Sequence, residues 1–218
     1  MLGGTYGHDT GWASSRYPRQ ARWPTTGPPS VWTGAAAYDR AVGKLIGRGA
    51  ALDERSVYLL ARLSPRYPTV EVRVADVAPD LDTAVLLAAL VRALVTTAVT
   101  DAQAGEPMPR PPRATIVAGL DAAARHGTAG PAIDPWTGAF TEPWALVRRM
   151  VDHTGRALTA SGDDATVARL LRAVEISGTG ADRQREAWHR AKSPAQLVAE
   201  LAAATWQDPY RPALAGAA

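Results

Sequence analysis

The sequence contains no cysteine, and this absence removes several classes of protein at once. Without cysteine there is no disulfide framework, no thiolate metal site and no cysteine nucleophile. The four histidines are His8, His126, His153 and His189, and no two of them have the spacing of a metal-ligand pair. Phosphate-binding loops, dinucleotide-binding fingerprints and nucleophile elbows are also missing. The sequence therefore does not support a P-loop nucleotidase, a Rossmann enzyme or a serine hydrolase.

Lysine is nearly absent as well. Only Lys44 and Lys192 occur among the 24 basic residues, and all the others are arginine. The isoelectric point is near 9.5, but the formal net charge is only +3. The basic balance therefore says little about partners and does not favour nucleic acid. Arginine does suit a bidentate grip on carboxylate or phosphate better than lysine does.

Long apolar runs are also scarce. The longest run, 84–99, is interrupted by Arg92 and does not reach the roughly 20 residues that span a bilayer. The first twelve residues lack the basic region and the apolar segment of a signal peptide. We therefore expect a cytoplasmic protein with no membrane partner.

What is present is an irregular arm followed by a mostly helical body. Residues 1–33 are rich in glycine, proline and tryptophan, and residues 34–206 form a single expected half-domain. Apolar residues at helical spacing predict a helix within 34–49 that glycines end. Further helices are predicted at 80–103, 114–126, 142–160, 163–176, 181–191 and 194–206. The tail 207–218 is expected to be disordered.

A β-hairpin is the main non-helical element that the sequence predicts. Two strand-like runs, 56–64 and 69–76, are joined by the short connection "PRYP". We therefore expect an α+β fold, with a small antiparallel sheet packed with a mostly helical C-terminal part. Two strands do not make an independently stable sheet. The hairpin must pack on its own helices or complete a sheet begun elsewhere.

Three groups of polar residues are candidates for binding. Glu71 and Arg73 share one face of a strand, roughly 7 Å apart, and either hold a charged ligand or form a loose ion pair in solvent. Asp9, Arg16 and Arg19 accompany tryptophans in the arm, which either contacts a ligand or packs as a loop. The stretch 178–185, "GTGADRQR", either presents a helix N-terminus to an anion or links to a surface helix.

Six segments in order carry a resemblance to a known family. They are "DTGWASSR", "RWPTTGPPSVW", "PTVEVRVADVAPDLDTAVLLAALVRALV", "ARHG", "DPWTG" and "GTGADRQR". Together they resemble the C-terminal half of carboxylate–amine ligases of the glutamate–cysteine ligase type 2 family, over residues 7–204. The resemblance implies a glutamine-synthetase-like catalytic fold that uses ATP and Mg²⁺. Such enzymes phosphorylate a glutamate-like carboxylate and let an amine attack the acyl phosphate.

The resemblance also implies roles for individual residues. Glu71 matches a metal-binding glutamate, and Arg73 matches a catalytic arginine that contacts phosphate or the carboxylate substrate. Arg16 matches the arginine that closes the first motif, where a substrate contact is expected. Arg183, Gln184 and Arg185 match a recurring stretch that we assign to nucleotide binding.

Departures from the family pattern shape the functional expectation. The family's acidic strand and histidine-containing strand have no counterpart here, and Leu60, Ala122 and Ser15 replace an aspartate, an arginine and a tyrosine. We expect one subunit of a split ligase, inactive alone, whose partner chain carries the N-terminal half. The alternative is a noncatalytic subunit that stabilises or regulates a full-length ligase paralogue. A stand-alone binding module is supported only by the basic arm.

Overall fold

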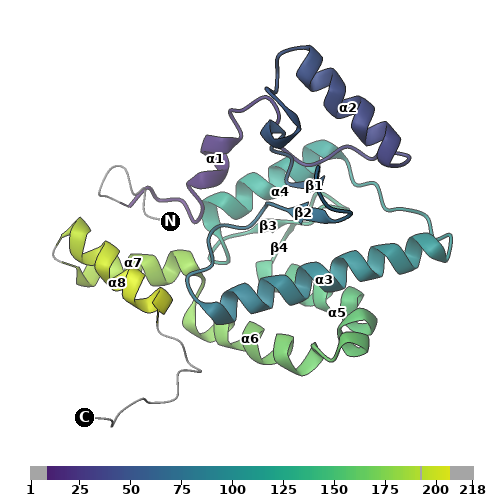
Figure 1. Ribbon diagram of the computed structural model, residues 1–218. Coiled ribbons are helices and arrows are strands. Elements are labelled where there is room, and N and C mark those ends of the chain that lie inside the picture. The colour runs from purple at the N-terminus through teal and green to yellow at the C-terminus, as the bar shows by residue number, and fades with distance from the viewer. Residues whose placement is uncertain (1–8, 192, 207–218) are drawn as a thin grey trace, which may run out of the picture. The chain divides into compact units, whose positions relative to one another are not determined.

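The computed structural model describes residues 9–191 and 193–206 (Figure 1). The tail at 207–218, expected to be disordered, lies outside the described residues. The chain divides into two compact units, each built from segments that are far apart in the sequence. Unit 1 comprises Met1–Thr10, Val77–Ala98 and Val151–Ala218, and unit 2 comprises Gly11–Asp76 and Val99–Met150. Each unit is described by itself.

Unit 2 contains the first predicted helix, α2 (Ala35–Gly47). Its periodic apolar face buries Tyr38 and Val42 against Ala51 and Val57, and Val57 is fully buried. Burying such side chains stabilises the folded chain by roughly 1.5–3 kcal/mol each. This cluster is the core on which the segment leading into the hairpin rests.

The predicted hairpin is present in unit 2 and is confirmed as antiparallel. Strands β1 (Ala61–Leu63) and β2 (Val70–Val72) pair so that Arg62 lies directly opposite Glu71. Both strands are shorter than the runs that predicted them. One reason is the 3₁₀ turn η1 (Glu54–Ser56), which occupies the start of the first run.

The apolar residues of β2 are exposed, whereas an ordinary amphipathic strand buries its apolar face. Val70, Val72 and Val74 are 45%, 40% and 44% exposed, whereas Arg62 on the other face is only 7% exposed. The polar face of the hairpin is therefore buried at Arg62 of β1 and partly open at Glu71 and Arg73, whose side chains are 36% and 37% exposed, while the valine face is exposed. This arrangement positions the charged residues of the candidate site.

The N-terminal arm packs along a helix of unit 2. Helix α1 (Arg16–Gln20) follows a segment whose Ala13 N–H donates to the carbonyl of Arg125 at 3.2 Å. That carbonyl lies at the end of α4 (Arg113–His126), and the Arg125 guanidinium stacks 4.3 Å from the Trp12 ring. For this part of the arm, the structure shows the packed loop rather than an open ligand-binding surface.

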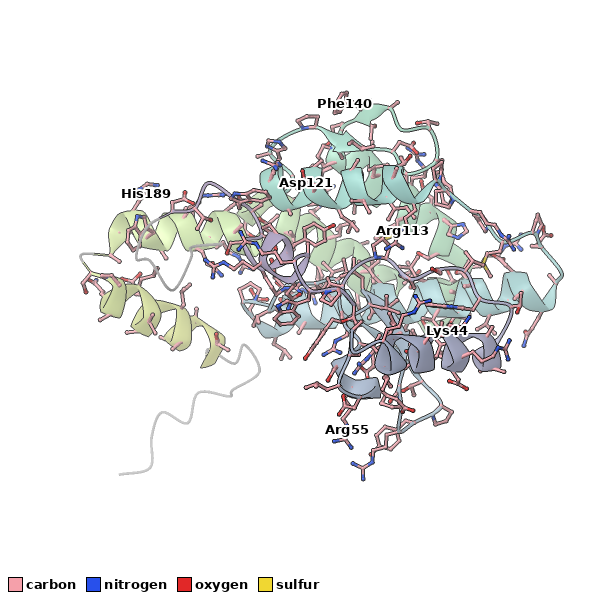
Figure 2. The ribbon with its side chains drawn as sticks, turned by 90° about the horizontal axis from the view of Figure 1, so that it is seen from above. Lys44, Arg55, Arg113, Asp121, Phe140 and His189 are labelled. Carbon is pink, nitrogen blue, oxygen red and sulfur yellow. The ribbon has the colours of Figure 1, made fainter. Side chains whose placement is uncertain are left out.

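A second small hairpin follows α4. Strands β3 (Ala132–Ile133) and β4 (Phe140–Thr141) enclose a turn in which Asp134 accepts the N–H groups of residues 136 and 137. Arg149 donates to the same carboxylate at 2.7 Å and holds the pKa of Asp134 below its usual value. Phe140 projects outward (Figure 2) and is 76% exposed. The "DPWTG" motif therefore has a structural role here.

Unit 1 has only helices as regular elements among its described residues. It contains α6 (Asp164–Ser177), α7 (Gly180–Arg190), α8 (Pro194–Trp206) and parts of two helices that also run into unit 2, α3 (Leu81–Gln103) and α5 (Pro143–Ser161). Its core is apolar and comes from α3, α5 and α6: Leu86, Ala89, Leu90, Ala93, Ala157, Leu158, Val167 and Leu170. These helices confirm the predicted helical C-terminal part.

Helix α3 is long and apolar enough, by length and composition, to cross a membrane. Its most apolar window has a mean hydropathy of 1.9, and 22% of that window is buried. The core helix of a soluble protein meets the same criterion. The absence of a membrane partner therefore stays a prediction.

Candidate functional site

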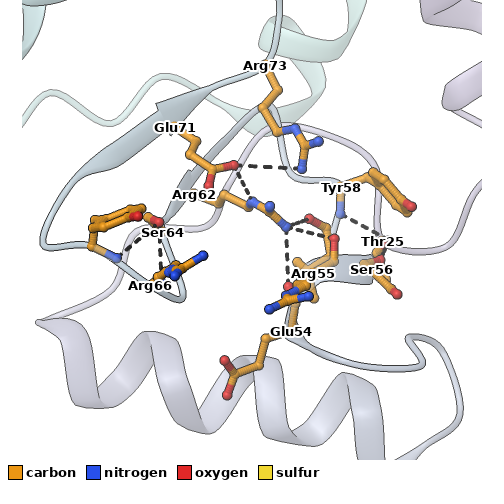
Figure 3. Close-up of polar contacts among 12 residues, drawn as sticks. Thr25, Glu54, Arg55, Ser56, Tyr58, Arg62, Ser64, Arg66, Glu71 and Arg73 are labelled. Atoms are coloured by element: carbon orange, nitrogen blue, oxygen red, sulfur yellow. Dashed lines mark hydrogen bonds and ion pairs between the residues drawn. The ribbon is translucent and has the colours of Figure 1, made fainter.

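Glu71 lies between two arginines in the candidate site. Its Oε2 accepts a hydrogen bond from Arg62 Nε at 2.9 Å and lies 3.9 Å from Arg73 Nη1 (Figure 3). Glu71 and Arg73 have side chains that are 36% and 37% exposed, so solvent weakens their attraction. The geometry supports an ion pair on a polar strand face, with the guanidinium of Arg73 partly open.

Arg62 is the residue of this cluster that sequence reasoning missed. Its side chain is 6% exposed, and its Nη1 donates to the carbonyls of Glu54, Arg55 and Val57 at 3.2, 3.0 and 2.7 Å. A charge this buried must be paired and hydrogen-bonded. The hairpin register held the signal, because it places Arg62 directly opposite Glu71.

Arg73 has unused hydrogen-bonding capacity. Its guanidinium lies 5.6 Å from the centre of the Tyr58 ring, and the Trp23 ring lies 4.7 Å from that of Tyr58. The Nη1 atom is buried and has no hydrogen-bond partner among the described residues. The side chain is 37% exposed, and a guanidinium held by a ring and a carboxylate can bind a carboxylate or phosphate oxygen on its open side.

Leu60 lies across the hairpin from Arg73. The Arg73 N–H donates to the Leu60 carbonyl at 2.7 Å, so the two residues face each other across the hairpin. Side chains that face each other in this way lie on the same side of the sheet. Leu60 is buried and its side chain offers no acceptor, in the place where the resemblance led us to expect aspartate.

Arg16 holds the chain that follows β2. Its Nε donates to Asp76 at 2.6 Å, and its Nη1 donates to the Gln20 side chain and to the carbonyl of residue 73. Its Nη2 donates to the carbonyls of residues 74 and 75. Arginine has five N–H donors, so this side chain is fully engaged. A substrate contact by Arg16 would require some of these bonds to break, and it stays a prediction.

The stretch predicted to bind nucleotide, residues 183–185, belongs to unit 1, whereas Arg16, Glu71 and Arg73 belong to unit 2. Arg183 donates to Asp80 through Nη1 and to Thr83 Oγ1 at 3.2 Å through Nη2. Arg185 donates to Asp9 at 3.2 Å, and Gln184 is half-buried. Both arginines therefore join distant segments of unit 1, and nucleotide binding by this stretch stays a prediction.

Asp80 is the carboxylate in this cluster whose titration the structure perturbs. Partial burial by itself raises the pKa of Asp80. Hydrogen bonds from the Thr83 backbone N–H, at 2.7 Å, and from Arg183 outweigh that effect and hold the pKa below its ordinary value. The ionised form thus stabilises the start of α3.

Helix α7 begins with a side-chain cap rather than an open anion site. The Thr179 hydroxyl accepts from the Asp182 N–H, and the Asp182 carboxylate accepts from the Thr179 N–H at 2.9 Å. Gly178, with a φ of +79°, ends α6 in a backbone conformation that favours glycine. For "GTGADRQR" the geometry matches a glycine connection followed by a capped helix.

The residues around Glu71 do not fit a magnesium ion by themselves. Magnesium prefers several oxygen ligands in an octahedral arrangement. The neighbours of the Glu71 carboxylate are two guanidinium groups, which repel a cation. Across residues 9–191 and 193–206, no group of three or more histidine, aspartate or glutamate side chains could hold a metal.

A surface pocket of about 550 Å³ lies beside η1, on residues 52–55 together with Ile46, Pro65 and Arg66. It includes neither Glu71 nor Arg73. The Glu71 and Arg73 side chains are 36% and 37% exposed, so the candidate site is a strand face partly open to solvent.

Comparison with known proteins gives the family context. A family model described as "Glutamate-cysteine ligase family 2 (GCS2)" matches residues 4–202. A protein from Frankia alni named "Putative glutamate–cysteine ligase 2-2" is 46% identical over 184 residues, which is 84% of this chain and 48% of that protein. A protein of the same name from Saccharopolyspora erythraea is 42% identical over 199 residues, 91% of this chain and 51% of that protein. The chain thus spans about half the length of the curated relatives it matches.

Proposed function

The chain belongs to glutamate–cysteine ligase family 2, and from that premise we propose that it supplies one wall of the active site of an ATP-dependent carboxylate–amine ligase. The observation that carries the proposal is Arg73, a partly exposed arginine beside Glu71 whose buried Nη1 has no hydrogen-bond partner among the described residues. The substrates proposed are ATP, a glutamate-like carboxylate and an amine: ATP transfers its γ-phosphoryl group to the carboxylate and leaves as ADP, and the amine then attacks the acyl phosphate, forms the amide and releases phosphate.

Arg73 binds an anionic oxygen in this proposal. Its guanidinium is oriented by the Tyr58 ring below it and by the Glu71 carboxylate beside it. A positive group held in advance at the position where negative charge develops lowers the barrier to phosphoryl or acyl transfer. Arg73 thereby grips the substrate carboxylate or the transferring phosphoryl group.

Glu71 orients Arg73 and neutralises the buried Arg62. Its carboxylate contacts both guanidinium groups, so removing it leaves Arg62 without its anionic partner. Magnesium ions accompany ATP in phosphoryl transfer of this kind. Because the described residues provide one carboxylate at this face, further metal ligands would come from the complementary polypeptide.

We assign that complement to a partner chain that carries the other half of the family's length. The described part of unit 2 offers only a two-stranded sheet at the site, and the matched relatives are about twice as long as the match. In this proposal the chain alone forms no amide and the pair does.

A reconstituted pair tests the proposal. The segment of the Frankia alni relative that lies outside the match is co-expressed with the full chain, and the purified pair is supplied with ATP, Mg²⁺, glutamate and cysteine. We expect ADP release and γ-glutamyl amide formation by the pair and by neither chain alone. A stable pair that releases no ADP with any amino-acid mixture would refute the catalytic assignment.

Leu60 favours one alternative, a noncatalytic subunit that stabilises a full-length ligase. It is 7% exposed and faces Arg73 in the place where the resemblance led us to expect aspartate, so a polar partner of Arg73 has been replaced by core packing. The alternative predicts an inactive pair that gains ADP release when Leu60→Asp restores a carboxylate. A pair that is already active with Leu60 excludes it.

A further inference from the structure

The hairpin has one edge whose backbone groups turn away from their partner strand. The Arg73 N–H donates to the Leu60 carbonyl at 2.7 Å, and further along the Ser64 N–H donates to the Thr69 carbonyl at 2.9 Å. In an antiparallel ladder, hydrogen-bonded pairs alternate with pairs whose N–H and C=O groups point outward. The positions of these two bonds therefore fix which of the residue pairs between them are hydrogen-bonded and which have outward N–H and C=O groups.

That pattern places the backbone groups of Val70 and Val72 on the outer edge of β2. Both residues occupy the alternate, non-bonded positions opposite Leu63 and Ala61. The sheet that contains β2 has two strands, β1 and β2, so no third strand among the described residues covers this edge. An uncovered edge of this kind is a template for pairing with another strand.

The face next to that edge is apolar and exposed. We use the name valine face for Val70, Val72 and Val74, which are 45%, 40% and 44% exposed. Edge strands of stable monomers usually carry charges or proline on the solvent side. Here the charged residues Arg62 and Glu71 lie on the opposite face, where Arg62 is buried and Glu71 is 36% exposed.

We propose that the outer edge and the valine face of β2 form the docking surface for a β-strand of the complementary polypeptide. The inference rests on the proposed function. The relatives hold about as much chain again as the part matched here, which provides an occupant of sufficient length. A strand added to this edge lies about 4.8 Å from β2. Its alternate side chains then stand beside Glu71 and Arg73 on one face and pack beside the valines on the other.

A pull-down with titrated affinities tests this surface. The probe is the co-expressed segment of the Frankia alni relative outside the match, and the full chain carries either Val72→Glu or Val72→Pro. The matched control is Val117→Glu, which changes a valine of equal exposure, 40%, on α4. Circular dichroism of each variant alone confirms that it folds.

The two variants separate the two parts of the surface. Glutamate at position 72 introduces a charge into an apolar contact, and we expect affinity for the probe to fall more than about tenfold. Proline at position 72 removes the outward N–H of that residue and leaves the bonds to β1 intact. Proline is tolerated at such edge positions. Loss of one backbone bond to the added strand then lowers affinity roughly 2- to 10-fold. Val117→Glu leaves affinity unchanged.

Each outcome decides between the surface and the proposed function. An active pair that binds Val72→Glu as tightly as Val117→Glu overturns the surface and leaves the function standing. A pair that loses affinity only with the Val72 variants, yet never releases ADP, supports the surface and overturns the function. Failure of the unmodified chain to bind the probe overturns both. A homodimer that Val72→Glu dissociates would show a second copy on this edge and overturn the proposal.

Discussion

Replacing Arg62 by methionine tests the central cluster of unit 2. Methionine keeps an unbranched apolar stem but removes the guanidinium. The carbonyls of Glu54, Arg55 and Val57 then lose their donor, and Glu71 loses its 2.9 Å partner. The fold at the start of β1 depends on this one side chain.

The expected magnitude follows from those four bonds. Each net hydrogen bond contributes about 1 kcal/mol, and one to a charged group contributes about 1.5–3 kcal/mol. The bond to Glu71 belongs near the low end, because that carboxylate is 36% exposed. Such contributions are not additive, so we expect a loss of about 3–4 kcal/mol, similar to breaking a buried ion pair. For a chain of 218 residues this lowers Tm by roughly 10 °C.

Thermal unfolding followed by circular dichroism measures the effect, with Glu71→Gln as the control. Glutamine keeps an amide oxygen that accepts from Arg62 Nε and leaves Arg62 its three carbonyls, so all four hydrogen bonds are retained and only the negative charge is lost; we expect a loss of about 1–2 kcal/mol, smaller than that of Arg62→Met. Arg62→Met and Glu71→Gln with equal Tm values would refute the reasoning. So would an Arg62→Met chain as stable as the unmodified one.

Two further predictions concern the other arginine clusters. Arg16→Gln frees the carbonyls of residues 73–75, and we expect roughly tenfold faster amide hydrogen exchange at Arg73, against unchanged exchange in α6; equal rates would show that Arg16 does not hold this segment. Partial burial raises the pKa of Asp80, but hydrogen bonds from Thr83 and Arg183 outweigh it and lower the pKa. The contribution of Asp80 to stability is therefore complete above the unfolded-state pKa near 3.9 and is lost as the pH falls through the folded-state pKa. Acid unfolding should therefore depend less on pH below about pH 4 in Asp80→Asn, and an unchanged profile would contradict the assignment.

Helices were predictable because their signals are local. The apolar spacing and following glycines located α2 (Ala35–Gly47), and Gly127, at a φ of +59°, ends α4 one residue after His126 as expected. The five-residue α1 escaped prediction, since it lies in a glycine- and proline-rich arm without a repeating apolar pattern. Short elements that depend on tertiary contacts leave little local signal.

The hairpin shows where local pattern stops being informative. Alternation predicted two faces for β2 but not which one turns inward. Which face turns inward depends on Arg62. Its hydrogen bonds to the carbonyls of residues 54, 55 and 57 join residues that no periodic pattern connects. The same limit applies to Arg16, because only the folded chain shows that its donors are engaged by residues 73–76.

The rate of ADP release by the reconstituted pair, compared between Arg73→Ala and Arg66→Ala, tests the central claim most directly. The two arginines are matched, since each guanidinium lies 5.6 Å from a tyrosine ring centre, Tyr58 or Tyr67. Of these two, Arg73 lies beside Glu71 and has a buried Nη1 without a hydrogen-bond partner among the described residues, and Arg66 has neither feature there. We predict that Arg73→Ala lowers the rate at least about 100-fold, as expected for losing a charged group that stabilises the transition state, while Arg66→Ala retains it. Equal rates for the two variants would contradict the assignment of Arg73 to the active site.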